Sequence, residues 1–234
     1  MAYKLVIGNK NTSSWSLRPW LALRQAGIAF DEINIALRMP DTKSQILKYS
    51  PSGKVPALIT GGRVIWDSLA ILEFLAETHP RAALWPKAAA ARAEARSIAA
   101  EMHAGFAALR EHCPMEFLKR APKARLPGPV AADVRRIVAL WQDCRRRHGA
   151  DGPFLAGRFS AADAMYGPVA SRFRTYLPDL APYGDDGTAQ AYVEALFALP
   201  AMAEWEQDAQ AEVAAARLPS RTPARGKRAL KTRR

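Results

Sequence analysis

The apolar positions of the first eighty residues switch repeatedly between two spacings, the two-residue period of β-strands and the 3.6-residue period of helices. A glycine pair at 61–62 separates two strand-like runs, which suits a tight hairpin because such turns require positive φ. Strands are predicted over residues 3–8, 30–37, 54–60 and 63–67, and helices over 16–26, 42–50 and 68–79. The order β-α-β-α-β-β-α combines a right-handed crossover with a terminal hairpin, and it predicts a four-stranded sheet with helices available for both faces.

The pattern changes after residue 79. The segment 79–87 contains two prolines, and strand-like alternation is absent beyond it. Alanine-rich amphipathic stretches follow, and they predict helices at about 88–112, 129–148, 160–177, 188–198 and 200–215. We therefore expect an α/β thioredoxin-like domain at residues 1–80, a linker at 81–87 and an all-helical second domain at 88–216.

The charge of the chain is concentrated at its carboxyl end. The formal net charge is +12, and eight of the positive side chains follow residue 216 with no acidic residue among them. This stretch has few apolar residues and two prolines, so residues 217–234 are predicted to form a disordered basic tail. Such a tail can attach to nucleic acid or to another anionic surface, or it can simply be solvated.

Several function classes are disfavoured by composition. The only two cysteines, Cys113 and Cys144, form no C-x-x-C pair and no Cys/His spacing typical of a metal site, so neither redox-dithiol chemistry nor a metal is expected. The chain has no uncharged apolar run long enough to span a bilayer, and its start, "MAYKLVIGNK", lacks the order of a signal peptide. We expect a soluble, cytoplasmic protein.

Four local motifs occur in order along the predicted elements: "SSWSLR" at 13–18, "SPSGKVPAL" at 50–58, "WDSLAILEFL" at 66–75 and "FSAADAMYGPV" at 159–169. Together they resemble the glutathione transferase superfamily, and the resemblance extends from Tyr3 to Leu218. The first motif resembles the serine motif of zeta-type and related bacterial enzymes. The chain departs from the zeta pattern at Trp15, where zeta enzymes have cysteine, and this weakens any assignment as an isomerase.

The hydroxyl cluster at residues 12–16 has two interpretations. Pro19 lacks an N–H and is best tolerated in a first helical turn, so we expect regular helical bonding to begin near Ser16, with Ser16 as the N-cap. Ser13 and Ser14 then lie in a loop at the carboxyl end of the first strand, where open α/β sheets bind ligands. A hydroxyl donating to sulfur favours the thiolate, although serines before helices are commonly just caps. The resemblance assigns thiol activation to Ser13 first and Ser14 second.

Two further segments suit the remainder of glutathione. A cis bond before Pro56 would turn the Val55 backbone away from the sheet, leaving it free to pair with a bound peptide, and Lys54 could meet a carboxylate. Asp67 and Ser68 stand at a helix start, where free N–H groups and the serine hydroxyl can bind a carboxylate while Asp67 accepts from an α-ammonium. The alternatives are an edge proline, a solvated lysine and ordinary helix caps.

The helical region offers a structural motif and a candidate pocket. Ser160 and Asp163 have capping-box spacing, to which we assign a folding role. Met102, His103 and Phe106 have the spacing of one helical face and are candidates to line a pocket for the electrophile, although an ordinary helical histidine is a common alternative.

The resemblance implies an enzyme that activates glutathione, its cosubstrate, as a thiolate for attack on a small electrophile, and it implies a homodimer. Conjugation, peroxide reduction, dehalogenation and isomerisation stay open, because all use the same thiolate. The alternative is a binding module of the same fold that its basic tail recruits to nucleic acid or an anionic surface.

Overall fold

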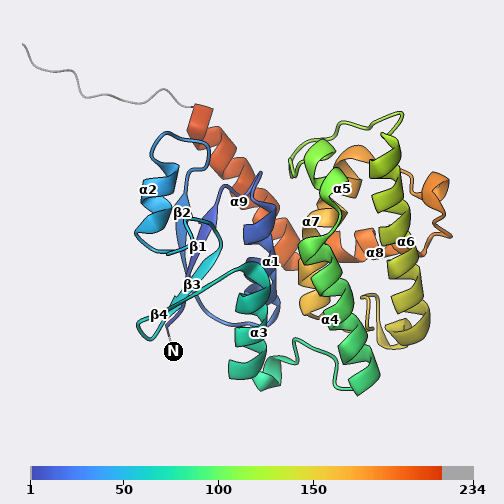
Figure 1. Ribbon diagram of the computed structural model, residues 1–234, viewed down its shortest axis with the longest axis horizontal. Coiled ribbons are helices and arrows are strands. Elements are labelled where there is room, and N and C mark those ends of the chain that lie inside the picture. Colours follow the sequence, from blue (N-terminus) through green and yellow to red (C-terminus); the bar gives the residue numbers. More distant parts are fainter. Residues whose placement is uncertain (1, 218–234) are drawn as a thin grey trace, which may run out of the picture.

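The computed structural model describes residues 2–217, and its amino-terminal part is built on a mixed sheet (Figure 1). The sheet has four strands in the order β2-β1-β3-β4, with β1 parallel to β2 and β3 antiparallel to both β1 and β4. The strands are β1 Lys4–Gly8, β2 Asp31–Ile35, β3 Ala57–Thr60 and β4 Arg63–Trp66. The predicted four-stranded sheet is therefore confirmed.

The sheet is covered on both faces because successive residues of β1 point to opposite sides. Leu5 and Ile7 join the large core formed with α1 and α3, whereas Val6 joins a smaller cluster with Ile46 of α2. These helices are α1 Ser14–Gln25, α2 Thr42–Leu47 and α3 Ser68–Thr78. The carboxyl end of β1 thus leads directly into the amino terminus of α1.

The second part of the chain is helical, with α7 at its centre (Figure 1). Every residue of α7 except Arg174 is buried, and α7 packs against α1, α4 and α8, so one core continues from the sheet into the helices. The helices are α4 Ala89–Ala104, α5 Ala107–His112, α6 Gly128–His148, α7 Ala161–Tyr176, α8 Thr188–Phe197 and α9 Pro200–Arg217. Among the described residues, no helix combines the length and apolar character needed to cross a membrane.

The start of α1 differs from the expectation. The helix begins at Ser14 with Ser13, not Ser16, at the N-cap position, and Pro19 lies inside the helix. The backbone N–H of Ser13 donates to Asn9 O at 2.8 Å, and the backbone N–H of Leu17 donates to Ser13 O. Because these main-chain bonds already hold residues 13–17, the helix begins earlier than residue 16. Ser16 uses its hydroxyl elsewhere, since its Oγ accepts from Gly8 N at 3.0 Å.

The helix predicted over 88–112 is divided in two. Gly105 has an extended backbone and Phe106 has a positive φ of 56°, which ends α4 and turns the chain into α5. The periodic pattern continues across the break because both helices bury apolar residues in the same core. Phe106 therefore does not belong to the helical face of Met102 and His103.

The capping box of α7 is present as predicted. Asp163 Oδ2 accepts from the backbone N–H of Ser160 at 2.7 Å, and Asp163 Oδ1 accepts from Leu155 N and from the hydroxyl of Tyr192. Burial raises the pKa of Asp163, against the effect of these donated hydrogen bonds. This carboxyl joins α7, α8 and the loop before α7.

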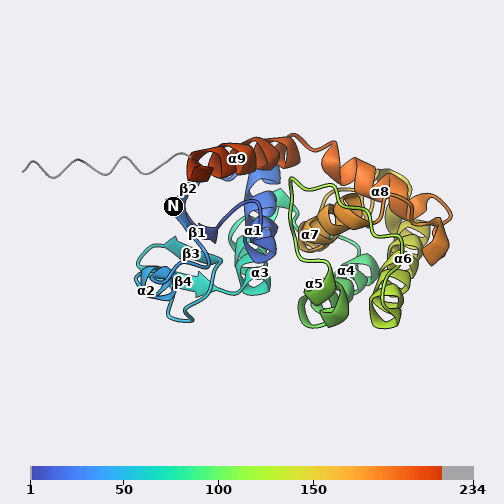
Figure 2. The same ribbon diagram turned by 90° about the horizontal axis from the view of Figure 1, so that it is seen from above.

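The last helix, α9, returns to the amino-terminal part of the fold. Figure 2 shows it extending above α1 and β2. Its Trp205 is fully buried, packs against Trp20 of α1 with ring centroids 5.0 Å apart, and donates from Nε1 to Lys10 O at 2.9 Å. The predicted basic tail, apart from its first residue Arg217, lies outside the described residues.

Candidate active site

A cavity of about 760 Å³ opens at the carboxyl end of β1. Three segments that are far apart in sequence line most of it: residues 12–15 at the start of α1, residues 52–56 before β3 and residues 66–68 at the start of α3. The fold places the strand-to-helix loop, the loop before the hairpin and a helix amino terminus around one space. This is the position at which open α/β sheets bind ligands.

Ser13 and Ser14 both line the cavity, and each is buried. The Oγ atoms of Ser13 and Ser16 lie 2.7 Å apart. Because Ser16 Oγ already accepts from Gly8 N, its own proton is free for donation to Ser13 Oγ. The Ser13 hydroxyl can then donate to a ligand in the cavity.

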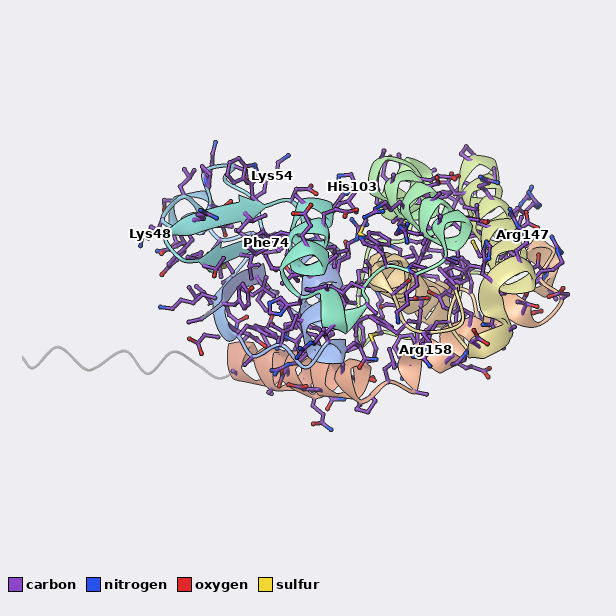
Figure 3. All side chains as sticks on the ribbon, turned by 90° about the horizontal axis from the view of Figure 1, so that it is seen from below. Lys48, Lys54, Phe74, His103, Arg147 and Arg158 are labelled. Atoms are coloured by element: carbon purple, nitrogen blue, oxygen red, sulfur yellow. The ribbon has the colours of Figure 1, made fainter. Side chains whose placement is uncertain are left out.

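The segment before β3 carries a cis peptide bond between Val55 and Pro56. The ladder of β3 with β1 begins only at Ala57, so the Val55 backbone stands outside the sheet pairing and beside the cavity. Lys54 is exposed at the rim. Figure 3 shows Lys54 and His103 on the same side of the molecule, one from each half of the fold.

Asp67 and Ser68 mark the start of α3. Asp67 has a positive φ of 77°, an unusual conformation for a non-glycine residue, and its Oδ1 accepts from Leu69 N at 2.9 Å. Its other oxygen, Oδ2, lies 3.4 Å from His103 Nε2 on α4. Ser68 is buried, and its Oγ accepts from Arg18 at 3.2 Å.

A group of arginines behind this site was missed by the sequence analysis. Arg18 is 1% exposed, and burial together with the charges of Arg172 and Arg110 lowers its pKa to about 9, while Asp67 opposes the shift. Burial and Arg110 also lower the pKa of Arg172, to about 10. Arg18 belongs to the quoted "SSWSLR" motif, but residue type alone does not separate a buried arginine from a solvated one.

Trp15 lines the cavity and lies beside two of these arginines. Its ring lines the cavity, and the guanidinium carbons of Arg18 and Arg110 lie 4.1 and 5.7 Å from its centroid. The His103 ring meets the same indole edge-on at 5.3 Å. The lining of the cavity thus includes an aromatic ring that has two positively charged side chains beside it.

The three residues predicted for an electrophile pocket are dispersed. His103 touches Asp67 and Trp15, whereas Met102 is fully buried in the core and Phe106 is 7% exposed beyond the end of α4. The lining of the cavity includes none of the three.

Comparison with known proteins agrees with this geometry. Residues 12–78 match the family model of the glutathione S-transferase amino-terminal domain. The chain is 30% identical over 177 residues to a probable maleylacetoacetate isomerase of Caenorhabditis elegans, covering 74% of this chain and 80% of that protein. It is also 30% identical over 182 residues to a maleylpyruvate isomerase of Ralstonia, covering 73% and 83%.

Solved structures show the same fold. A glutathione transferase homologue from Burkholderia, with bound glutathione, superposes with a TM-score of 0.67 at 18% identity, over 90% of this chain and 99% of that one. An epsilon-class glutathione S-transferase from housefly also gives a TM-score of 0.67, at 20% identity over 91% and 96% of the two chains. The chain belongs to the glutathione S-transferase family.

Proposed function

We propose that this protein binds glutathione in the cavity at the carboxyl end of β1, stabilises its thiol as a thiolate with Ser13, and adds the sulfur to a small electrophile. The observation that carries the proposal is the Ser13 hydroxyl, which lines the cavity at the amino terminus of α1 and can accept a hydrogen bond from Ser16 Oγ while donating its own proton to a ligand. A donated hydrogen bond and the helix dipole both favour an anion over a neutral thiol. The relatives give no support to the alternative of a binding module.

In this proposal, each of the other predicted residues binds a different part of glutathione. The Val55 backbone, outside the sheet ladder, pairs with the glutathione backbone as an added strand. Asp67 accepts from the α-ammonium of the γ-glutamyl end, and Ser68 with the free N–H groups of α3 binds its carboxylate. Lys54, at the rim of the cavity, pairs with the carboxylate at the other end of glutathione.

For the electrophile we propose an acid that contains a cis carbon–carbon double bond conjugated to a carbonyl. Arg18 and Arg110 beside Trp15, together with Arg172 near these two arginines, favour an anionic substrate, and several relatives are named as maleylacetoacetate or maleylpyruvate isomerases. The thiolate adds to the double bond, the electron pair moves to the carbonyl oxygen as an enolate, and the resulting single bond rotates. The enolate then re-forms the double bond and expels the thiolate, so glutathione is not consumed.

The preference for an anionic substrate can be tested by comparing turnover of such an acid with turnover of its neutral ester and of chlorodinitrobenzene. Arg110 is only half-buried, so Arg110→Gln should lower activity on the acid about tenfold while changing activity on the two neutral compounds little. An equal loss on all three would contradict recognition of the acid by this arginine. Complete absence of isomerisation with retained conjugation would move the assignment to a conjugating transferase.

Glutathione recognition by Asp67 can be measured by calorimetric titration. Asp67→Asn removes the negative charge facing the α-ammonium, and the loss of one charge-assisted hydrogen bond should raise the Kd about 10- to 100-fold. Asp41→Asn is the matched control, because Asp41 also stands at a helix N-cap but lies at α2. Unchanged affinity in Asp67→Asn would remove this residue from the site, and absence of binding at millimolar glutathione in the parent protein would overturn the proposed function.

We also propose a homodimer related by a two-fold axis, because closed two-fold symmetry is the commonest arrangement of soluble oligomers and Trp66 beside the cavity is 48% exposed in the single chain. Light scattering should give about twice the chain mass of 25.7 kDa. A monomer at working concentration would contradict this arrangement.

A further inference from the structure

The loop that carries Ser13 is held by a helix about two hundred residues away in sequence. Glu212, on α9, accepts through Oε2 from the backbone N–H of Lys10 at 2.7 Å and through Oε1 from the side-chain amide of Asn9. One carboxylate therefore binds two consecutive residues at the start of the β1–α1 loop. A carboxylate with two donors fixes orientation as well as distance.

Asn9 transmits this contact to Ser13. Its backbone oxygen accepts from the N–H of Ser13 at 2.8 Å and from that of Thr12 at 3.1 Å. Its side-chain oxygen accepts from Leu37 N at 2.7 Å, so the amide joins α9 to the segment after β2. The position of the Ser13 backbone thus depends on a residue that Glu212 holds directly.

The neighbouring residue fixes the helix that supplies Glu212. Lys10 is 4% exposed, and its Nζ lies 2.8 Å from Glu32 and 2.5 Å from Asp208 of α9. The same ammonium lies 4.9 Å from the centroid of Trp20 and 5.3 Å from that of Trp205. Buried aromatic rings and paired charges on both sides of the loop keep α9 in one register against it.

We propose that Glu212 is a positioning residue for the thiolate chemistry, holding the loop so that the Ser13 hydroxyl meets the glutathione sulfur. The proposal rests on the proposed function of Ser13. Glu212 is not among the residues that line the cavity, and its carboxylate bonds to Asn9 and Lys10, so we expect its effect on Ser13 to pass through Asn9. Small displacements of a hydrogen-bond donor are costly when the donor must face a developing anion.

The test compares Glu212→Gln with Glu204→Gln in the full-length protein, by titrating the ultraviolet absorbance of the bound glutathione thiolate against pH. Glu204 is the matched control because it lies on the same helix and pairs with Arg24 of α1 at 2.9 Å without contacting the loop. Both variants remove one carboxylate between α9 and the amino-terminal part. Glu212→Gln should raise the thiol pKa by about 0.5 to 1 unit, and Glu204→Gln should leave it in place.

The double variant Ser13→Ala with Glu212→Gln separates this inference from the proposed function. If Glu212 acts through Ser13, its effect on the thiol pKa should vanish once Ser13 is alanine. If Glu212→Gln still shifts the thiol pKa in the Ser13→Ala background, the inference is overturned and the proposed function stands. The same holds if Ser13→Ala shifts the thiol pKa and Glu212→Gln does not. No shift in Ser13→Ala overturns the assigned role of Ser13 and the inference with it.

A second variant covers the case in which Glu212→Gln does not fold. Asn9→Asp breaks the same pair from the loop side, because it removes the amide donor while keeping the oxygen that accepts from Leu37 N. It should raise the thiol pKa in the same direction. An unmoved value in a folded Asn9→Asp protein overturns the inference.

Discussion

Replacing Ser13 with alanine should raise the pKa of the bound glutathione thiol by about one to two units. Turnover near neutral pH should slow by about 10- to 100-fold. The reason is the loss of a hydrogen bond to a charged sulfur, which is worth about 1.5–3 kcal/mol. Since one pKa unit corresponds to about 1.36 kcal/mol, this loss equals about one to two units. The pH–rate profile should move to higher pH, since a larger fraction of the thiol stays protonated at neutral pH. Glutathione affinity should change less, because the contacts proposed for the γ-glutamyl end lie at Asp67 and Ser68.

Ser14→Ala is the control for this experiment, because Ser14 lines the same cavity and is equally buried. An effect at Ser14 and none at Ser13 would keep the mechanism and correct the residue. The thermal stability of Ser13→Ala should fall only slightly, because the Ser13 side chain makes no capping hydrogen bond and loses one bond to Ser16. A clear loss of stability with an unmoved pH–rate profile would instead identify Ser13 as a purely structural residue.

The elements of the sheet were predictable because their signals are local. The apolar run of β1, the alternation in β2 and the Gly61-Gly62 turn depend on residues that neighbour each other in sequence, and the structure has these strands within a few residues of the predicted bounds. The start of α1 was predicted two residues late. Its position depends on the backbone oxygen of Asn9, and the sequence has no marker for a bond between two main-chain groups in a loop.

The predicted glutathione residues lie around one cavity for a similar reason, since each belongs to a motif at the end of an element: Ser13, Ser14, Lys54, Val55, Pro56, Asp67 and Ser68. The residues that were missed act across long separations. Arg18 meets Ser68 from 50 residues away, and Glu212 meets Lys10 from 202. A solvated arginine or glutamate has the same local sequence signal as a buried one, so these partners became apparent only with the fold.

Replacing Asp163 with alanine should destabilise the protein by about 4 kcal/mol and lower the melting temperature by roughly 10 °C. The change leaves the backbone N–H groups of Leu155 and Ser160 and the hydroxyl of Tyr192 without their acceptor in a fully buried place. Each buried donor left unpaired costs about 1–3 kcal/mol, and loss of a helix cap costs about 1 kcal/mol. Scanning calorimetry measures the effect, and a shift of only a degree or two would show that water satisfies these donors.

Asp163→Asn separates the charge of this carboxyl from its geometry. The amide keeps an oxygen for Leu155 N–H and the Tyr192 hydroxyl, so the loss of stability should be about half that of the alanine variant. Burial raises the pKa of Asp163 in the folded state. The neutral carboxyl therefore contributes its full stability below the unfolded-state pKa of about 3.9, and this contribution is lost as the pH rises through the folded-state pKa. The asparagine variant has no proton to lose there. The difference in melting temperature between the parent and Asp163→Asn should therefore be largest in acid and narrow as the pH is raised. A difference that widens with pH would mean that the hydrogen bonds donated to this carboxyl, and not burial, determine its pKa.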